Sequence, residues 1–549
     1  MEDRNTMNRR TGVKAAALAA AGALLLSACS TSTTGSDAGG DGSALTVGTT
    51  DKVVALDPAG AYDNGSSLVE QQIYPFILAY KPGTAELNPS IAESADFTEP
   101  TKYEVKLKDG LKYANGNDLT SSDVKFSFDR QLKIQDPNGP SSLLGGLASV
   151  ETPDDTTVVF NLKRENDQTW PGVLASAAGP IVDEDVFSPD ALTPDQEIVD
   201  AEAFSGPYTI DSFKFNELIT YKAYPDYQGY VEPAKTDSVQ MRYYSDANNM
   251  KLDVQKGTID VAWRSLSATD IEDLGKDENL TVHKGPGGEI RYIVYNMDTM
   301  PFGAKTDDPD EKKALAVRQA MADSIDRQAI ASQVYKDTYT PLYSFVPDGL
   351  PGANEALKSA YGDGQGGADV EKAKKALEDA GVQTPVDLNL QYNPDHYGPS
   401  SGDEYALIKD QLDKTGLFNV NLQSTEWVQY SEDRTSDVYP MYQLGWFPDY
   451  SDADNYLVPF FYDTDETPSF LANHFRDDQI NKELTDQAST ADKAEREKEL
   501  GTIQDQLSEQ LPTLPLLQGN QIAVSGKDVK GVEETLDPAF QFRLALLSK

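Results

Sequence analysis

Few side chains of this chain are of the types that act as nucleophiles or metal ligands. It has one cysteine and three histidines in 549 residues, so zinc sites built from thiolates or several histidines are excluded. One spacing suits covalent chemistry. Lys125 follows Ser122 by one helical turn, and a lysine so placed can take the proton of the serine hydroxyl. A second such element is Lys414-Thr415-Gly416, which needs to lie on a strand beside the nucleophile.

Together these segments resemble the penicillin-recognising serine hydrolases, which are the remote alternative for this chain. Two observations disfavour them. Lys414-Thr415-Gly416 follows a helical pattern and reads as the end of that helix, with Gly416 just past it. Ser245-Asp246-Ala247-Asn248 misses the remaining element by one insertion. We therefore expect no catalytic residue and no enzymatic activity.

A group of acids at Asp449, Asp452 and Asp454 raises the question of calcium. The segment lacks the glycine and the distal glutamate of an EF-hand loop, so a solvated acidic loop is the favoured interpretation. We predict no metal site and no cofactor.

The charge balance excludes another class. There are 90 acidic and 47 basic residues, which gives a formal net charge of −43 and an isoelectric point near 4.3. Such a surface repels phosphate backbones, so we predict no nucleic-acid partner. The hydrophobic fraction of 39% is that of an ordinary globular chain, and the length suits two or three domains.

The N-terminus has the pattern of an export signal. Basic residues precede an unbroken run of small apolar residues at 15–28, which is too short to cross a bilayer of about 30 Å. The run ends at Cys29, and this order resembles a bacterial lipoprotein signal. We predict a signal peptide at 1–28, lipidation of Cys29 and a flexible tether at 29–43. The protein would then be held on the extracytoplasmic face of the cell membrane by its lipid alone.

The remainder divides into a strand-rich first part and a mixed second part. In the first part a buried helix is predicted at 71–80 and a helix with Thr120 or Ser121 as N-cap. The predicted strands there are 45–49, 103–107 and 157–162, with strands and turns alternating over 206–263. In the second part the predicted strands are 291–297, 386–392, 419–424 and 515–524, and the predicted helices are 310–335, 369–380, 403–415 and 488–511.

Four segments resemble, in order, the bacterial extracellular solute-binding proteins of family 5, which serve ABC importers of peptides and nickel. They are Tyr103 to Ser127, with its Lys-Asp-Gly-Leu turn; Gly206-Pro207-Tyr208 with Pro225-Asp226-Tyr227; Val317 to Arg327; and Gly445-Trp446-Phe447-Pro448-Asp449-Tyr450. The resemblance covers essentially the whole exported chain.

The resemblance implies an α/β fold of the large, class C periplasmic-binding-protein type, with two lobes around a hinged cleft. Lobe I would span 44–288 and hold an inserted subdomain at about 85–203. Lobe II would span 289–512, and 513–549 would return to lobe I.

The same resemblance implies a monomeric receptor that captures di- or oligopeptides between its lobes and delivers them to the permease subunits of an ABC importer. A non-peptide solute, such as an oligosaccharide, an opine or a metal chelate, is the alternative.

For the site, the resemblance points to Asp449 as the carboxylate that binds the ligand amine. Trp446, Phe447 and Tyr450 would surround it with aromatic bulk. Pro448 departs from the family pattern, where a small residue is usual, and it removes an N–H donor.

Further ligand-binding candidates come from residue type and position. Arg434 could take a ligand carboxylate, with a surface salt bridge as the alternative, and Trp427 could stack on a ligand side chain or belong to the core. The edges at 445–448 and 263–267, which include Trp263, could pair with an extended peptide. Two further candidates for the cleft wall are Tyr295 and Asn296.

Overall fold

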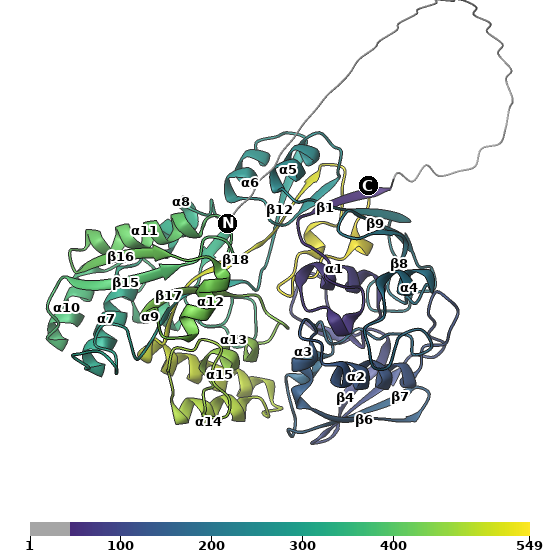
Figure 1. Ribbon diagram of the computed structural model, residues 1–549, viewed down its shortest axis with the longest axis horizontal. Coiled ribbons are helices and arrows are strands. Elements are labelled where there is room, and N and C mark those ends of the chain that lie inside the picture. The colour runs from purple at the N-terminus through teal and green to yellow at the C-terminus, as the bar shows by residue number, and fades with distance from the viewer. Residues whose placement is uncertain (1–43) are drawn as a thin grey trace, which may run out of the picture. The chain divides into compact units, whose positions relative to one another are not determined.

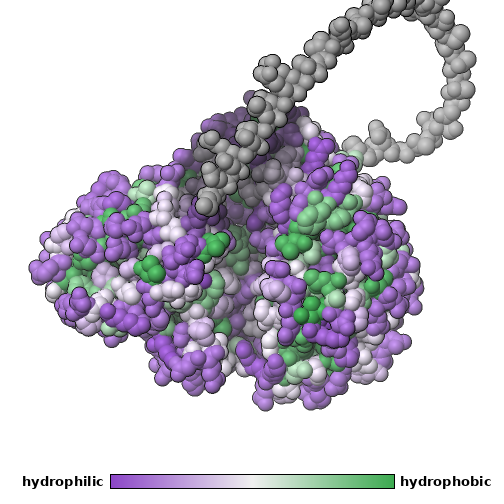
Figure 2. All heavy atoms as spheres, viewed as in Figure 1, coloured by the Kyte–Doolittle hydropathy of each residue, from purple (hydrophilic) through white to green (hydrophobic). Residues whose placement is uncertain are grey.

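The computed structural model describes residues 44–549. The predicted signal peptide, Cys29 and the predicted tether lie outside the described residues. Within 44–549, no helix has both the length and the apolar character that a membrane span requires. Hydrophilic residues cover most of the face shown in Figure 2, in keeping with the excess of acids.

The first lobe is built on a seven-stranded sheet in the order β12-β19-β11-β1-β10-β9-β8 (Figure 1). Strand β1 lies between β10 and β11 and runs parallel to both, and the other pairs are antiparallel. The strands are β1 (Leu45–Thr49), β8 (Tyr208–Lys214), β9 (Leu218–Ala223), β10 (Ser238–Tyr243), β11 (Val261–Trp263), β12 (Leu280–Gly285) and β19 (Gln521–Gly526). Its helices are α1 (Asn64–Ile73), α4 (Asp195–Asp200), α5 (Ala247–Gln255) and α6 (Ala268–Leu274).

Helix α1 is held by its first turn. The side chain of Asp63 caps it by accepting a hydrogen bond from the N–H of Ser66 at 2.9 Å. At position 65 a Cβ would lie 1.9 Å from the carbonyl oxygen of Lys52, so only glycine lets the helix approach that segment.

The predicted helix at 71–80 is wrong in its bounds. Tyr74 has extended backbone, with φ −105° and ψ 150°, because the ring of Pro75 disfavours a helical conformation in the residue before it. The helix ends at Ile73, and Leu78–Tyr80 forms strand β2 instead.

A four-stranded antiparallel sheet in the order β4-β5-β7-β6 lies within the range predicted for the inserted subdomain. Helix α2 packs on it and begins in a capping box, where Asp123 accepts from the N–H of Thr120 at 2.8 Å. The elements here are β2 (Leu78–Tyr80), β3 (Leu87–Pro89), β4 (Ala92–Glu99), β5 (Lys102–Leu107), β6 (Leu147–Asp154), β7 (Thr157–Leu162), α2 (Ser121–Ile134) and α3 (Trp170–Val173).

The second lobe is built on a six-stranded sheet in the order β14-β18-β13-β17-β15-β16. The strands are β13 (Ile290–Tyr295), β14 (Tyr339–Pro341), β15 (Val386–Tyr392), β16 (Phe418–Ser424), β17 (Met441–Trp446) and β18 (Thr513–Gly519). Its helices are α7 (Glu311–Ser324), α8 (Arg327–Gln333), α9 (Ala356–Ala360), α10 (Val370–Ala380), α11 (Ser401–Lys414), α12 (Trp427–Thr435), α13 (Asp454–Phe461), α14 (Asp478–Gln487) and α15 (Lys493–Gln510). The predicted helix at 310–335 is in fact two helices, because the Asp326 side chain caps α8 and ends the run.

The chain passes between the two sheets at Gly287-Gly288 and again at Asn520. The two crossings touch through their backbones, since a Cβ on Gly287 would lie 2.0 Å from the carbonyl oxygen of Gly519. The predicted return at residue 513 is too early. Strand β18 is buried throughout and pairs with β13 and β14, so the chain leaves the second lobe only after Gly519. Two sheets joined by two crossings confirm the expected two-lobed α/β fold.

Candidate functional site

A cavity of about 360 Å³, here called the first cavity, lies between helix α1 of the first lobe and the end of β17 in the second. It brings together segments that are almost four hundred residues apart in the sequence. From the first lobe its wall includes Tyr62, Asp63, Asn64, Ser67, Glu70, Gln71 and the turn around Ser176, and from the second lobe His396, Trp427 and the run Gly445, Trp446, Phe447, Pro448 and Asp449.

Asp449 is fixed by one neighbour. The side chain of Asn455 accepts a hydrogen bond from the Asp449 N–H at 2.9 Å and donates one to the carboxylate oxygen Oδ2 at 3.0 Å. The same amide oxygen of Asn455 accepts from the indole N–H of Trp446 at 3.1 Å. This clamp gives the loop one conformation and points the carboxylate of Asp449 into the cavity wall.

The other carboxylate oxygen of Asp449 reaches across the cleft, where Oδ1 accepts a hydrogen bond from the hydroxyl of Tyr62. Among the described residues Asp449 forms no salt bridge. Burial raises its pKa above the ordinary value, and the hydrogen bonds from Asn455 and Tyr62 oppose that rise. A cation placed beside this carboxylate would restore its charged form.

Aromatic rings form the rest of the second-lobe wall. The ring of His396 stacks on Trp427 with centroids 3.7 Å apart and planes 5° apart, and burial lowers the pKa of His396, which favours the neutral ring. Trp446 packs edge-on against Phe460. Phe447 lies against Phe540, which comes from the first-lobe end of the chain.

A second cavity of about 420 Å³ adjoins the first and shares His396, Tyr397, Phe447 and Phe540 with it. Its charged groups are already paired. Arg264 Nε lies 2.9 Å from an oxygen of Asp51, and Arg291 Nε lies 3.2 Å from an oxygen of Glu289. Because they share these four residues, the two cavities are treated as one groove between the lobes.

The structure brings Asp449, Trp446, Phe447 and Trp427 together in the wall of the first cavity. Tyr450 points away from it. Its ring contacts Gly172, in the core of the four-stranded subdomain, so it joins the lobes rather than facing the cavity.

Four other predicted residues line neither cavity. Arg434 is buried and donates to the carbonyl oxygen of Phe470 at 2.8 Å, and Trp263 stacks on Phe542 in the first-lobe core. Tyr295 lies in the second-lobe core, and Asn296 donates to Asp437 at 2.9 Å. These four residues are therefore not part of the proposed binding site.

Both predicted strand edges border the groove. Gly445, Trp446, Phe447 and Pro448 line the first cavity, and the segment from Arg264 to Ser267 lines the second. Strand β15 pairs with β17 only at Met441 and Tyr442, so the later part of β17 has no strand partner on that side.

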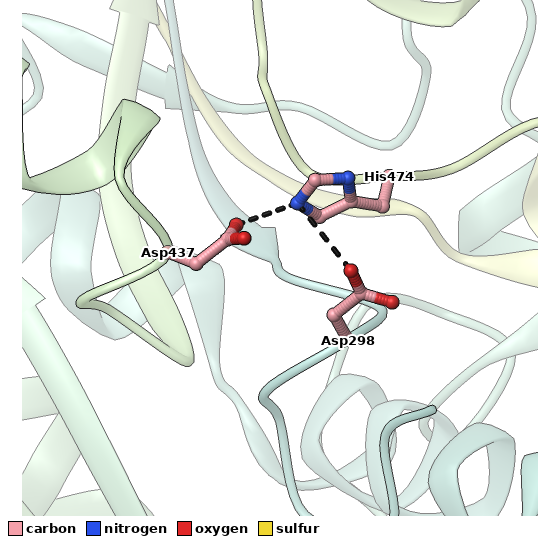
Figure 3. A group of neighbouring side chains, drawn as sticks. All are labelled: Asp298, Asp437 and His474. Atoms are coloured by element: carbon pink, nitrogen blue, oxygen red, sulfur yellow. Dashed lines mark hydrogen bonds and ion pairs between the residues drawn. The ribbon is translucent and has the colours of Figure 1, made fainter. Parts of the chain in front are cut away.

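The described residues contain one group that has the composition of a metal site, formed by Asp298, Asp437 and His474 (Figure 3). Its carboxylates already have partners within the described residues. The ammonium group of Lys305 lies 2.7 Å from Asp298, and His474 Nε2 lies 2.5 Å from an oxygen of Asp437. The group lines neither cavity and is best described as an ion-paired cluster that ties three loops together.

The alternative chemistries find no matching geometry. The hydroxyl of Ser122 donates to Glu184, while Lys125 pairs with Asp129 instead of the serine. Lys414-Thr415-Gly416 follows helix α11, and Gly416 has φ +70°, as expected of a helix end. In the acidic loop, Arg496 binds both oxygens of Asp452 at 2.7 and 2.8 Å, which places a cation there already.

Sequence reasoning missed the first-lobe side of the site. Tyr62 and Glu70 come from a segment where no apolar periodicity marks a helix, although Asp63 followed by Ser66 was a usable N-cap signal. Asn455 was missed because its role depends on how the loop folds back.

Comparison with known proteins agrees with this geometry. The family model "Bacterial extracellular solute-binding proteins, family 5 Middle" matches residues 86–468. The dipeptide-binding protein of Escherichia coli (strain K12) is 25% identical over 411 residues, 71% of this chain and 73% of that protein. Heme-binding protein A of Haemophilus influenzae is 25% identical over 505 residues, 87% of this chain and 86% of that protein.

A solved structure shows the same fold. The ABC transporter-associated periplasmic binding protein DppA from Helicobacter pylori, in complex with the peptide STSA, superposes with a TM-score of 0.70 at 20% identity, covering 92% of this chain and 98% of that chain. Since the family model spans most of the chain and both lobes are present, this protein belongs to the bacterial extracellular solute-binding proteins of family 5.

Proposed function

We propose that this protein is the receptor of an ABC importer and captures di- or oligopeptides in the groove between its lobes. The observation that carries the proposal is Asp449, a partly buried carboxylate that is clamped by Asn455, faces Tyr62 across the first cavity and has no cation beside it within residues 44–549. A free peptide amine is a cation of the right size to complete this site. The dipeptide-binding relative supports a ligand of this class.

The rest of the peptide would follow the groove. The part of β17 that lacks a strand partner offers backbone groups to an extended chain, and the aromatic wall around Trp427 and Trp446 accepts apolar side chains without demanding one sequence. The hydrogen bond from Tyr62 to Asp449 joins the lobes directly at the amine site. Ligand binding there would favour the closed arrangement, which the permease subunits would recognise.

Lipid attachment at Cys29 would hold the receptor at the extracytoplasmic face of the membrane, as a monomer and without chemistry of its own. The family is extracellular, which supports export. Mass spectrometry of the intact exported protein tests the anchor: a diacylglyceryl mass on an N-terminal Cys29 is expected, and a mature chain that starts elsewhere would overturn it.

The test of the ligand class combines identification and affinity. Mass spectrometry of small molecules released by denaturing the purified protein should find peptides, and a sugar, an opine or a metal chelate would instead establish the alternative solute. Calorimetry with a released peptide should show that Asp449→Asn lowers affinity at least about 100-fold, because the amine would then lie buried without its charge partner.

Asp410→Asn is the matched control. It makes the same chemical change on an exposed helix that lines neither cavity, so peptide affinity should not change. Unchanged affinity in Asp449→Asn, with normal folding, would overturn the assignment of Asp449.

A further inference from the structure

Glu70 stands apart from every other buried acid in residues 44–549. It lies on α1 in the wall of the first cavity, is 1% exposed, and neither carboxylate oxygen has a hydrogen-bond partner among the described residues. Each of the others has at least one donor: they are Asp57, Asp123, Asp167, Asp183, Glu289, Asp323, Glu404, Asp454 and Asp537. Leaving a buried carboxyl without any partner is unfavourable, so such a group points to a partner from outside.

The surroundings of Glu70 offer it no cation. The charged groups that act on its pKa are Asp63 and Asp57, both acids, and the charge of Asp57 is already matched by Arg130. The wall of the first cavity contains no lysine or arginine. Its carboxyl groups are Asp63, Glu70 and Asp449, whereas one peptide amine requires only one of them.

We propose that Glu70, assisted by Asp63, forms a second cation subsite in the first cavity, which takes the ammonium or guanidinium group of a basic ligand side chain. The inference rests on the proposed function and narrows it to peptides with lysine or arginine near the amino end. Asp63 and Glu70 lie seven residues apart, about two helical turns, so both are on one face of α1, and both line the same cavity as Asp449. A long basic side chain on the first or second residue of a peptide whose amine is held at Asp449 would extend toward this face.

Proton linkage gives the subsite a signature. Burial, together with the charges of Asp63 and Asp57, raises the pKa of Glu70 well above its ordinary value, which favours the protonated form while the subsite is empty. The other titratable groups in the cavity wall are Tyr62, Tyr397, His396 and Asp449. A cation binds the ionised form of Glu70, and therefore binding of a basic peptide should release a proton and strengthen as pH rises.

The experiment compares two peptides that differ in charge but hardly in shape, Arg-Ala-Ala and citrulline-Ala-Ala, by calorimetry on the full chain. The unaltered protein should bind the arginine peptide at least about tenfold more tightly, because a buried charge-assisted pair is gained. Glu70→Gln should reduce this ratio to near one, because the arginine side chain then has no carboxylate partner in the subsite. The matched control is Asp410→Asn, which also changes a carboxyl group to an amide but lies outside both cavities, so it should keep the full ratio.

A second readout does not depend on any variant. Binding enthalpies of the unaltered protein, measured in buffers of different ionisation enthalpy, should show release of a proton with the arginine peptide and a clearly smaller release with the citrulline peptide. Equal affinities and equal proton release for the two peptides would overturn this inference and leave the peptide receptor intact. Binding of neither peptide would overturn the proposed function and this inference with it.

Discussion

The two cavities of the groove differ in how their charges are neutralised. In the second cavity Arg264 and Arg291 each lie beside a carboxylate of the protein. In the first cavity neither Asp449 nor Glu70 has an arginine or lysine beside it among the described residues. Since buried charges must be paired, the second cavity is electrostatically complete as the protein stands, and the first is completed only by a ligand. On the proposed function, selection of the ligand by its charge would belong to the first cavity.

The largest effect is expected when a cation is removed from the second cavity, which tests whether its paired charges are needed for stability. Arg291→Met leaves Glu404 and Glu289 buried without their base, and we expect a loss of about 3–5 kcal/mol in the free energy of unfolding by urea. Lys414→Met, which opens an exposed ion pair, serves as control and should have little effect. A loss of less than about 1 kcal/mol in Arg291→Met would show that the pairing there is not essential.

A smaller effect is expected at the hydrogen bond that joins the lobes. Tyr62→Phe removes a donor to a carboxylate, which contributes about 1.5–3 kcal/mol, so peptide affinity should fall about tenfold or more while the protein still folds. Calorimetry measures it. In Tyr462→Phe, which lies at the end of α13 outside both cavities, affinity should be unchanged. Tighter binding by Tyr62→Phe would mean that Tyr62 competes with the ligand for Asp449.

The third prediction concerns pH and Glu70. Its pKa is raised in the folded state above the ordinary 4.5, so the folded form binds more protons than the unfolded one and loses stability as pH rises above about 4.5. Glu70→Gln removes this loss. Relative to the unaltered protein its free energy of unfolding should rise between pH 5 and pH 8, measured by urea unfolding.

A Glu-to-Gln substitution beside Arg291 of the second cavity provides the comparison for Glu70→Gln. Glu404→Gln weakens a carboxylate that already binds Arg291 and Tyr335, so it should lower stability at both pH values. A higher free energy of unfolding in Glu404→Gln, or no pH-dependent rise of it in Glu70→Gln, would show that the two regions do not differ in this way.

The smallest effect is expected outside the groove. Lys305→Met removes the ammonium group from the cluster of Asp298, Asp437 and His474, but this lysine side chain is 63% exposed and its pairs are screened by water. The midpoint of thermal unfolding should shift by no more than about 2 °C. Peptide affinity should not change, and a change in it would show that this cluster is coupled to the groove.

Much of the fold could be predicted from local pattern. Alternating apolar residues marked β5 and β15, a short apolar run marked β7, and Gly381, with φ +72°, ended α10 as expected. The resemblance of one short segment to the family pointed to Asp449, Trp446 and Phe447, which line the first cavity together. The start of α1 was missed because Asn64-Gly65-Ser66-Ser67 shows no apolar periodicity, and its position depends on a distant contact with Lys52.

The four predicted residues that line neither cavity are explained by one physical cause. Residue type marked Arg434, Trp263, Tyr295 and Asn296 as candidates, but which face of a sheet or helix borders the groove is decided by packing between distant segments. Arg434 finds its acceptor at Phe470, and Trp263 stacks on Phe542 near the other end of the chain. Glu70 is the opposite case. It is distinguished by the absence of a hydrogen-bond partner among the described residues, and no sequence pattern reveals such an absence.

The contact between the two crossings has a mechanical consequence. A single connecting strand would leave one lobe free to twist as well as to bend relative to the other. Because Gly287 and Gly519 meet backbone to backbone, the two connections are joined side by side, and torsion about either one strains the other. The degree of freedom left by such a pair would be bending across it, so a hinge motion would carry the two walls of the first cavity apart and together along a single path. Tyr62 and Asp449 would then meet again in the same register at each closure.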